Sequence, residues 1–161
     1  MSAEGEISRG GSDVTVRRLT TSDIPAVSAI LSESPDAAAW SQDSLCQLAP
    51  QGFHAWVAEQ AAGVAGFLIG RIAGDEFEIL NLAVARTFRR CGIASKLLES
   101  ALEFSRIAGS QRVYLEVRAS NEPAVGLYTR HGFTKCGMRT RYYRNPAEDA
   151  LLFSRHIGGT P

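Results

Sequence analysis

A short basic turn between a strand-like and a helix-like segment is the part of this chain best suited to chemistry. It reads Arg89-Arg90-Cys91-Gly92-Ile93-Ala94, the pattern R-x-x-G-x-A. A helix that begins after a small-residue turn leaves its first backbone N–H groups without helical partners, and these groups form an anion site. Arginines pair well with phosphate oxygens. The turn therefore predicts a phosphate-bearing ligand; the alternative is an ordinary glycine-containing helix entry.

A carboxylate within an apolar strand is the second feature that could do chemistry. Glu116 lies inside the strand-like run 113–117. A carboxylate in such a place is unusual unless it is paired or functional. The alternative is a glutamate on the exposed face of the strand, which the alternation of strand residues also allows.

The elements that must position these residues follow one another in a regular order. Alternating or apolar runs predict strands at 14–19, 53–59, 64–72, 77–85, 112–117, 133–143 and 150–156. Helical spacing and capping residues predict one helix after Asp23 and a short one from Ser41 to about Leu48. A third helix follows Gly92 to about residue 108, and a fourth spans 121–130.

The resulting order, βααβββαβαββ, predicts a mixed α/β (α+β) sheet of about seven strands flanked by about four helices. The first strands form a meander, whereas the later β-α-β-α-β portion requires a crossover and hence parallel pairing. Residues 1–13 and 158–161 are polar and aperiodic, so we expect disordered tails there. Residues 14–157 are then a single domain.

Composition excludes several classes of function. Seventeen Lys and Arg residues balance 17 Asp and Glu residues, so no global charge favours nucleic acid or an anionic membrane. No apolar run approaches the roughly 20 residues that span a bilayer, and the N-terminus lacks the charged-then-apolar order typical of a signal peptide. The three cysteines and three histidines are scattered, which predicts no metal site and a reduced, cytoplasmic setting.

Two familiar phosphate loops do not fit the turn. A Walker A loop reads G-x-x-x-x-G-K-[ST]. Lys96 lies four residues after Gly92, but no second glycine precedes it and no Ser or Thr follows it. A dinucleotide fingerprint needs G-x-G-x-x-G near the first strand of a βαβ unit, whereas this turn has one glycine and lies in mid-chain. The turn therefore belongs to neither nucleotide-binding class.

The turn and a second motif together resemble the GNAT family of acyl-CoA-dependent N-acetyltransferases. The second motif runs from Asn121 to Phe133 as N-x-x-A-x-x-L-Y-x-x-x-G-F. Within the family the chain is most similar to RimI-type peptide N-terminal acetyltransferases. The shared strings are W-S at 40–41, N-L-A-V at 81–84, L-E-V-R-A-S-N at 115–121, Y-Y at 142–143 and E-D-A at 148–150. The resemblance covers about residues 14–157 and implies the GNAT fold.

The resemblance implies acetyl-CoA as cosubstrate, with no metal. Backbone N–H groups of the basic turn would hold its pyrophosphate, and a strand edge would pair with its pantetheine arm. A backbone N–H at that edge would polarise the thioester carbonyl. The residues expected to bind the cosubstrate are Leu82, Ala83, Val84, Arg89, Arg90, Cys91, Gly92, Ile93, Ala94, Ser95 and Asn121.

The resemblance also implies two catalytic residues. Glu116 would be the general base, and Tyr128 the acid that protonates the departing CoA thiolate. A packed aromatic is the alternative for Tyr128. A peptide α-amine, with a pKa near 7.7–8.0, has a far larger neutral fraction than a lysine side chain near 10.4. A modest base therefore suffices for an α-amine.

The expected acceptor is the N-terminal α-amine of a protein, namely a ribosomal protein with N-terminal alanine. In similar enzymes the peptide groove would involve Trp40, Arg141, Tyr142 and Tyr143, and Glu148 or Asp149 could attract the ammonium group. Two alternatives stay open, an acetyltransferase for a small amine or lysine and a non-catalytic acyl-CoA-binding module. We expect no nucleic-acid or membrane partner, and a monomer or weak homodimer.

Overall fold

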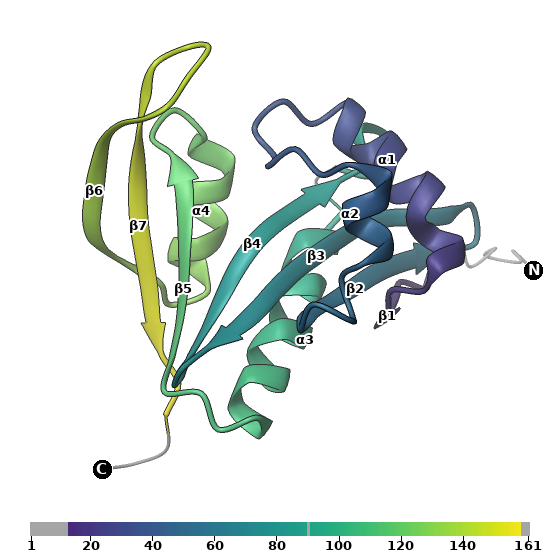
Figure 1. Ribbon diagram of the computed structural model, residues 1–161, viewed down its shortest axis with the longest axis horizontal. Helices are drawn as coiled ribbons and strands as arrows, with labels where there is room; N and C mark the ends of the chain where they lie inside the picture. Colours follow the sequence, from purple (N-terminus) through teal and green to yellow (C-terminus); the bar gives the residue numbers. More distant parts are fainter. Residues whose placement is uncertain (1–12, 90, 159–161) are drawn as a thin grey trace, which may run out of the picture.

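Seven strands in a single sheet carry the described part of the chain, residues 13–89 and 91–158 of a computed structural model (Figure 1). The strands are β1 (Thr15–Arg18), β2 (Phe53–Gln60), β3 (Gly63–Ala73), β4 (Glu76–Val84), β5 (Arg112–Arg118), β6 (Thr134–Tyr143) and β7 (Glu148–His156). Their spatial order is β1-β2-β3-β4-β5-β7-β6. Only β4 and β5 pair in parallel among the described strands. The predicted mixed sheet is confirmed.

Four α-helices lie where the sequence predicts them. They are α1 (Ile24–Ser32), α2 (Gln42–Cys46), α3 (Ile93–Ile107) and α4 (Glu122–Arg130), with short 3-10 turns η1 (Thr21–Asp23) and η2 (Arg86–Phe88). Ser41 caps α2 by accepting the Ser44 N–H, but the helix ends at Cys46, before the predicted Leu48. None of the described helices is long and apolar enough to cross a membrane.

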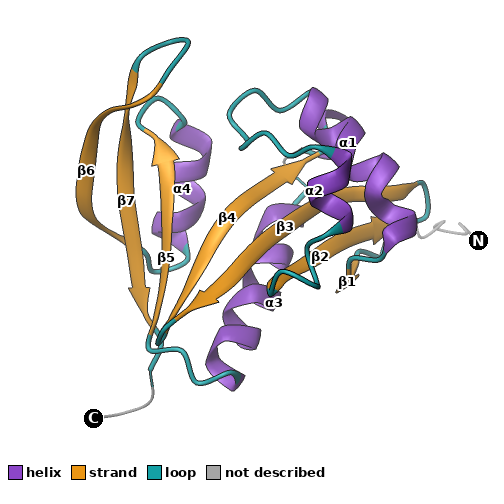
Figure 2. Cartoon of the chain, in the orientation of Figure 1, coloured by secondary structure: helices purple, strands orange, loops and turns teal. Residues whose placement is uncertain are grey.

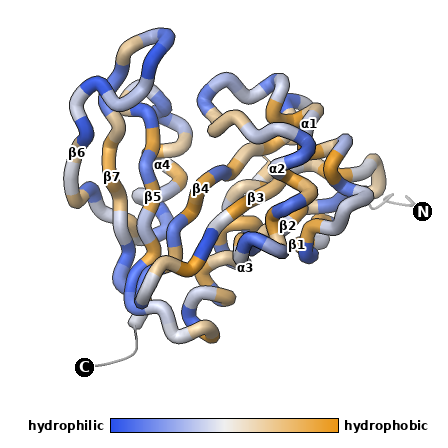
Figure 3. Tube along the Cα trace, viewed as in Figure 1, coloured by the Kyte–Doolittle hydropathy of each residue, from blue (hydrophilic) through white to orange (hydrophobic). Residues whose placement is uncertain are grey.

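The helices divide between the two faces of the sheet and create two cores (Figure 2). Helices α3 and α4 cover one face, where Leu97, Leu98 and Leu127 pack with Phe77. Helices α1 and α2 cover the other face over β2–β4, where Val27 and Leu45 are buried. Apolar residues run along β3 and β4, whereas the edge strand β6 is largely hydrophilic (Figure 3). On β5, Val113, Leu115 and Val117 face the α3–α4 core, so Tyr114 and Glu116 lie on the opposite face.

A β-bulge in β4 changes which side chains face each core. Ile69 pairs with Asn81 and Gly70 pairs with Ile79, so Leu80 is an extra residue in β4. Ile79 faces the α3 core, whereas Asn81 and Ala83 face the α1–α2 side. A strand without this bulge would place all three on one face, because strand residues alternate. The bulge thus turns Asn81 toward the loop before α2.

Gly70 provides a test of the packing around this bulge. A Cβ added there would lie 2.6 Å from Phe77 Cε1 and 2.9 Å from the Glu78 carbonyl oxygen. Phe77 is fully buried and cannot move away easily. Gly70→Ala should therefore lower the free energy of unfolding by about 1–3 kcal/mol, the usual effect of overpacking. Urea unfolding of both proteins measures the difference.

Gly126→Ala is the matched control for that substitution. In α4 the added Cβ would approach only Arg130 Nη1, at 3.2 Å, the far end of a flexible side chain. Alanine favours a helix over glycine by about 1 kcal/mol, so this variant should be as stable as the native chain or more so. Equal destabilisation by both substitutions would contradict the packing argument.

The predicted tails fall almost wholly outside the described residues, which exclude 1–12 and 159–161. At the described end of the C-terminal tail, Gly158 donates its N–H to the Gln111 carbonyl oxygen at 3.0 Å. Among residues 13–89 and 91–158, no group of three or more His, Cys, Asp or Glu residues is placed to hold a metal ion.

Candidate active site

The parallel strands β4 and β5 diverge toward their C-terminal ends (Figure 1). Their pairing begins at Glu76 opposite Arg112 and ends at Ile79 opposite Leu115. Strand β4 stays paired with β3 as far as Val84. On the side of β5, the backbone of residues 80–84 therefore has no strand partner within the described sheet. An extended ligand can pair with this edge.

The strand edge predicted to bind the cosubstrate has packed side chains and an open backbone. Leu82 and Val84 are half-buried and pack against the α3 core. Ala83 is buried on the opposite face, with α1 and α2. The side chains are thus core residues, and only main-chain groups remain to meet a ligand.

The turn after β4 ends in a helix N-terminus with free amides. Gly92 is the N-cap of α3, and its φ of +75° lies in the left-handed region that favours glycine. The Lys96 N–H donates to the Gly92 carbonyl oxygen at 3.2 Å, which closes the first turn of the helix. The N–H groups of Ile93, Ala94 and Ser95 precede that bond and point out of the helix end. This geometry fits the predicted anion site.

The side chains of the turn contribute less than its backbone. Ile93 is buried in the core beneath the sheet. Arg89 turns back, and its Nε donates to the Val84 carbonyl oxygen at 3.2 Å. Cys91 is exposed, and Arg90 lies outside the described residues. In this structure the Arg89 side chain therefore stabilises the end of β4, and its Nε is already occupied by that contact.

Helices α3 and α4 are linked beside the same turn. Ser95 Oγ lies 3.1 Å from His131 Nε2, at the C-terminal end of α4. Asn121 caps the other end of α4, where its Oδ1 accepts the Ala124 N–H at 3.3 Å. The predicted capping role of Asn121 is confirmed.

Glu116 is held by one of its two carboxylate oxygens. Its side chain is 18% exposed on β5. Oε1 accepts the Tyr114 hydroxyl at 3.1 Å and Arg139 Nε at 2.9 Å. Burial raises the pKa of Tyr114, which keeps that hydroxyl protonated as a donor. Neither of these bonds uses Oε2, and Tyr142 lies close to the same carboxylate, because the negative charge of Glu116 raises the pKa of that tyrosine.

Tyr128 is buried on α4, where its ring meets Phe133 edge-on with centroids 5.6 Å apart. Burial raises the pKa of Tyr128 well above its ordinary value, and Tyr143 adds to the shift. The phenol therefore stays protonated at neutral pH. The Tyr128 ring packs against Phe133, so the ring can stabilise the core while the hydroxyl is available as a proton donor.

The residues expected at the peptide groove lie on two segments. Trp40, before α2, packs its ring edge-on against Phe53 at 5.5 Å. Tyr142 and Tyr143 end β6 with their rings edge-on at 5.2 Å, and Tyr142 is 51% exposed. Burial raises the pKa of Tyr143 to about 12. The charge of Glu116 raises the pKa of Tyr142, so this exposed tyrosine lies beside the predicted base, whereas Trp40 packs within its own segment.

The other groove residues are engaged within the β6–β7 hairpin. Arg141 is exposed with a φ of 50°, and its N–H donates to Asp149 Oδ1 at 2.8 Å. Glu148 Oε1 accepts the Ser120 N–H at 2.5 Å, and Oε2 lies 3.4 Å from Arg118 Nη1. Both carboxylates thus hold protein groups in this structure.

Four residues around the site were not singled out from the sequence. Tyr114 shares a strand face with Glu116, and the alternation of β5 was sufficient to find it. Arg139 reaches Glu116 from β6, and no local pattern indicates that contact. No local pattern indicates the contact of His131 with Ser95, or the contacts of Arg118 with Asp36 and Glu148, because these partners are distant in sequence.

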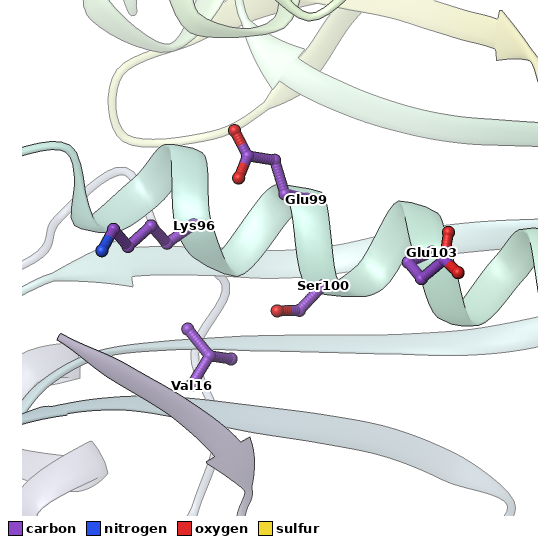
Figure 4. A pocket seen from close by; sticks show the side chains of 5 residues that line it. All are labelled: Val16, Lys96, Glu99, Ser100 and Glu103. Carbon is purple, nitrogen blue, oxygen red and sulfur yellow. The ribbon is translucent and has the colours of Figure 1, made fainter.

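A hollow between α3 and β1 is lined by none of the residues predicted for the site (Figure 4). Lys96, Glu99, Ser100 and Glu103 of α3 line it, together with Val16 of β1. Lys96 extends toward the start of the helix. The carboxylates of Glu99 and Glu103 make this hollow unsuited to phosphate groups.

The pattern of the Acetyltransferase (GNAT) family matches residues 18–133. The match includes the parallel strands that separate, the glycine turn at the start of α3 and the helix with Tyr128. The chain therefore belongs to the GNAT acetyltransferase family, and it is an N-acetyltransferase. Members of this family take their acetyl group from acetyl-CoA.

The chain is similar over most of its length to ribosomal-protein-alanine N-acetyltransferases and to the protein Ard1. Ribosomal protein bS18-alanine N-acetyltransferase of Escherichia coli K12 is 30% identical over 145 residues, covering 89% of this chain and 97% of that relative. The crystal structure of the Escherichia coli ribosomal-protein-S18-alanine N-acetyltransferase has a TM-score of 0.80 at 29% identity, covering 92% and 97% of the two chains. Ard1 of Thermoplasma volcanium has a TM-score of 0.81 at 30% identity, covering 91% and 99%.

Proposed function

We propose that this enzyme transfers the acetyl group of acetyl-CoA to the N-terminal α-amine of a protein, namely a ribosomal protein with N-terminal alanine. The observation that carries the proposal is Glu116, whose carboxylate lies on β5 one residue beyond the last pair with β4 and is oriented through Oε1 by Tyr114 and Arg139. The similarity to ribosomal-protein-alanine acetyltransferases supports the choice of acceptor. It also supports a cytoplasmic site of action.

The described residues fit acetyl-CoA at two points. The amides of Ile93, Ala94 and Ser95 at the start of α3 suit the pyrophosphate, since Gly92 brings no side chain into their approach. The open edge at 82–84 suits the amides of the pantetheine arm, as an added strand does. Bound acetyl-CoA supplies an activated thioester carbonyl.

Glu116 Oε2 takes the proton from the acceptor amine, directly or through one water. Tyr114 and Arg139 fix the other carboxylate oxygen and thereby orient the group. An α-amine with a pKa of 7.7–8.0 is already neutral in roughly a tenth of molecules at pH 7. A carboxylate base is therefore adequate for this acceptor and poorly matched to a lysine side chain. The neutral amine then attacks the thioester carbonyl.

Tyr128 donates its phenolic proton to the CoA sulfur as the carbon–sulfur bond breaks. Its raised pKa keeps the proton available over the working pH range. The acetyl group ends on the amine nitrogen, which loses its second proton as the amide forms. That proton balances the one that Tyr128 gives to the sulfur, and the thiol leaves.

Turnover assays with defined acceptors test the proposed function. Purified enzyme should release CoA thiol in the presence of acetyl-CoA and a peptide that begins with alanine, or with ribosomal subunits. The same peptide blocked at its N-terminus should release none. Absence of turnover with both free acceptors would refute the proposed acceptor.

Gly92→Ala should weaken acetyl-CoA binding about tenfold. A left-handed conformation costs a non-glycine residue about 1–2 kcal/mol, so the amide turn shifts away from its binding geometry. Calorimetry measures the dissociation constant.

Gly109→Ala is the matched control for this prediction. Gly109 follows the other end of α3 with a φ of +83°, and an added Cβ meets no atom within 4 Å at either glycine. Both variants should lose similar stability, but only the change at Gly92 should weaken binding. Equal affinities would contradict the assignment of the turn.

A further inference from the structure

Arg118, at the end of β5, contacts both segments expected to border the acceptor. Its side chain is 14% exposed, and its Nε lies 3.7 Å from Asp36 Oδ1 in the segment between α1 and α2. Its Nη1 lies 3.4 Å from Glu148 Oε2 at the start of β7. Its Cζ stands 4.2 Å over the ring of Tyr143 at the end of β6. One guanidinium therefore joins parts of the chain that are distant in sequence.

Each segment that Arg118 joins is also fixed to the sheet or to a helix. Asn81 Nδ2 donates to the Ala38 carbonyl oxygen at 3.0 Å, which holds the α1–α2 segment to β4. Glu148 Oε1 accepts the Ser120 N–H at 2.5 Å, just before α4. The contacts of Arg118 therefore connect two segments that each have one further anchor, and they add to the interactions that set the spacing between these segments.

The α1–α2 segment and the start of β7 lie close together at Arg118. Asp36 and Glu148 approach a single guanidinium at 3.7 and 3.4 Å, so the two segments stand about one guanidinium apart at this point. A planar guanidinium can bind two carboxylates and stack on an aromatic ring at once. A lysine ammonium has neither the fork nor the flat face. A large acceptor side chain entering here has to separate the two carboxylates.

We infer that Arg118 is a positioning residue that holds these two segments together and so selects acceptors whose first side chain is small. This inference rests on the proposed function, because it concerns the specificity of the same site. Arg118 touches no reacting atom in this account. It acts through Asp36, Glu148 and Tyr143 on the width of the groove.

The test compares two acceptor peptides that differ only in the first residue, alanine or leucine. We expect Arg118→Lys to lower the ratio of kcat/KM for alanine over leucine by about tenfold, the size of a typical steric discrimination. Asp36→Asn, at a 53% exposed side chain, should lower the ratio in the same direction and leave folding intact. The dissociation constant of acetyl-CoA should not change in either variant.

Arg17→Lys is the matched control. Arg17 also bridges two carboxylates, those of Asp23 at 2.8 Å and Glu59 at 2.9 Å, but at the β1 edge of the sheet. The Arg17→Lys variant should keep the native ratio of kcat/KM for the alanine peptide over the leucine peptide. An unchanged ratio in Arg118→Lys and Asp36→Asn, or an equal loss with both peptides, would overturn the inference.

A second measurement separates this inference from the proposed function. Absence of turnover with either peptide in the native enzyme would refute the proposed acceptor. Amide hydrogen exchange of residues 33–40 then tests the role of Arg118 directly. Faster exchange in Arg118→Lys and Asp36→Asn than in Arg17→Lys is expected, and equal exchange in all three would overturn the inference.

Discussion

Glu116→Gln should lower kcat/KM for an alanine-starting peptide by about a hundredfold or more, the usual contribution of a general base. Glutamine keeps the shape of the side chain and still accepts from Tyr114 and Arg139. It cannot take a proton from the acceptor. Acetyl-CoA binding should be unchanged, since the proposed cosubstrate site consists of backbone groups on β4 and α3. Thiol release at saturating acetyl-CoA measures the loss.

The pH dependence of this loss distinguishes a lost base from a distorted site. Without the base, the rate depends on the fraction of acceptor amine that is already neutral. That fraction rises about tenfold per pH unit below the amine pKa of 7.7–8.0 and levels off above it. The deficit of Glu116→Gln should therefore shrink between about pH 6.5 and 9. A constant deficit across this range would contradict the role of Glu116 as base.

Glu76→Gln is the matched control on the same pair of strands. Glu76 pairs with Arg112 at 3.6 Å, where β4 and β5 begin. It is a strand glutamate with an arginine partner, like Glu116, but lies at the opposite end of the paired segment. Its substitution should leave kcat/KM near the native value.

Tyr128→Phe should lower kcat by about a hundredfold with little change in acetyl-CoA affinity. The ring keeps its contact with Phe133, so the fold and its stability should persist. The lost hydroxyl removes the proton donor for the departing thiolate, an effect confined to the transition state. Single-turnover measurement of acetyl transfer isolates this step.

Packing and proton donation at Tyr128 can be separated by a second variant. Phe133→Leu changes the ring contact but leaves the hydroxyl, so it should cost stability and retain most of kcat. The raised pKa of Tyr128 also means that its ionisation does not reduce the native rate below about pH 10. Native-like kcat in Tyr128→Phe would contradict its role as acid.

Strand alternation, capping residues and the glycine turn were sufficient to predict the order of elements and the position of the strand that carries Glu116. These features are local, and local patterns are visible in a sequence. Asn121 and Ser41 cap their helices as expected, because a side-chain oxygen before a helix satisfies a free N–H.

Features that depend on contacts between distant segments were not predictable. The bulge at Leu80 reverses the face of Asn81, and no residue type in β4 indicates it. Arg89 is predicted to bind the cosubstrate, and its Nη2 contact with the Glu33 carbonyl oxygen at 3.5 Å joins residues too distant in sequence for any local pattern to indicate. The partners of Glu116 and Arg118 lie on other elements, so only the fold brings them together.

The most direct test of the account is to locate the transferred acetyl group by tandem mass spectrometry. The acceptor is a peptide with a free N-terminal alanine and one internal lysine, incubated with the native enzyme and acetyl-CoA. The account predicts one acetyl group on the α-nitrogen and none on the lysine. Acetylation of the lysine in preference to the α-nitrogen would contradict it.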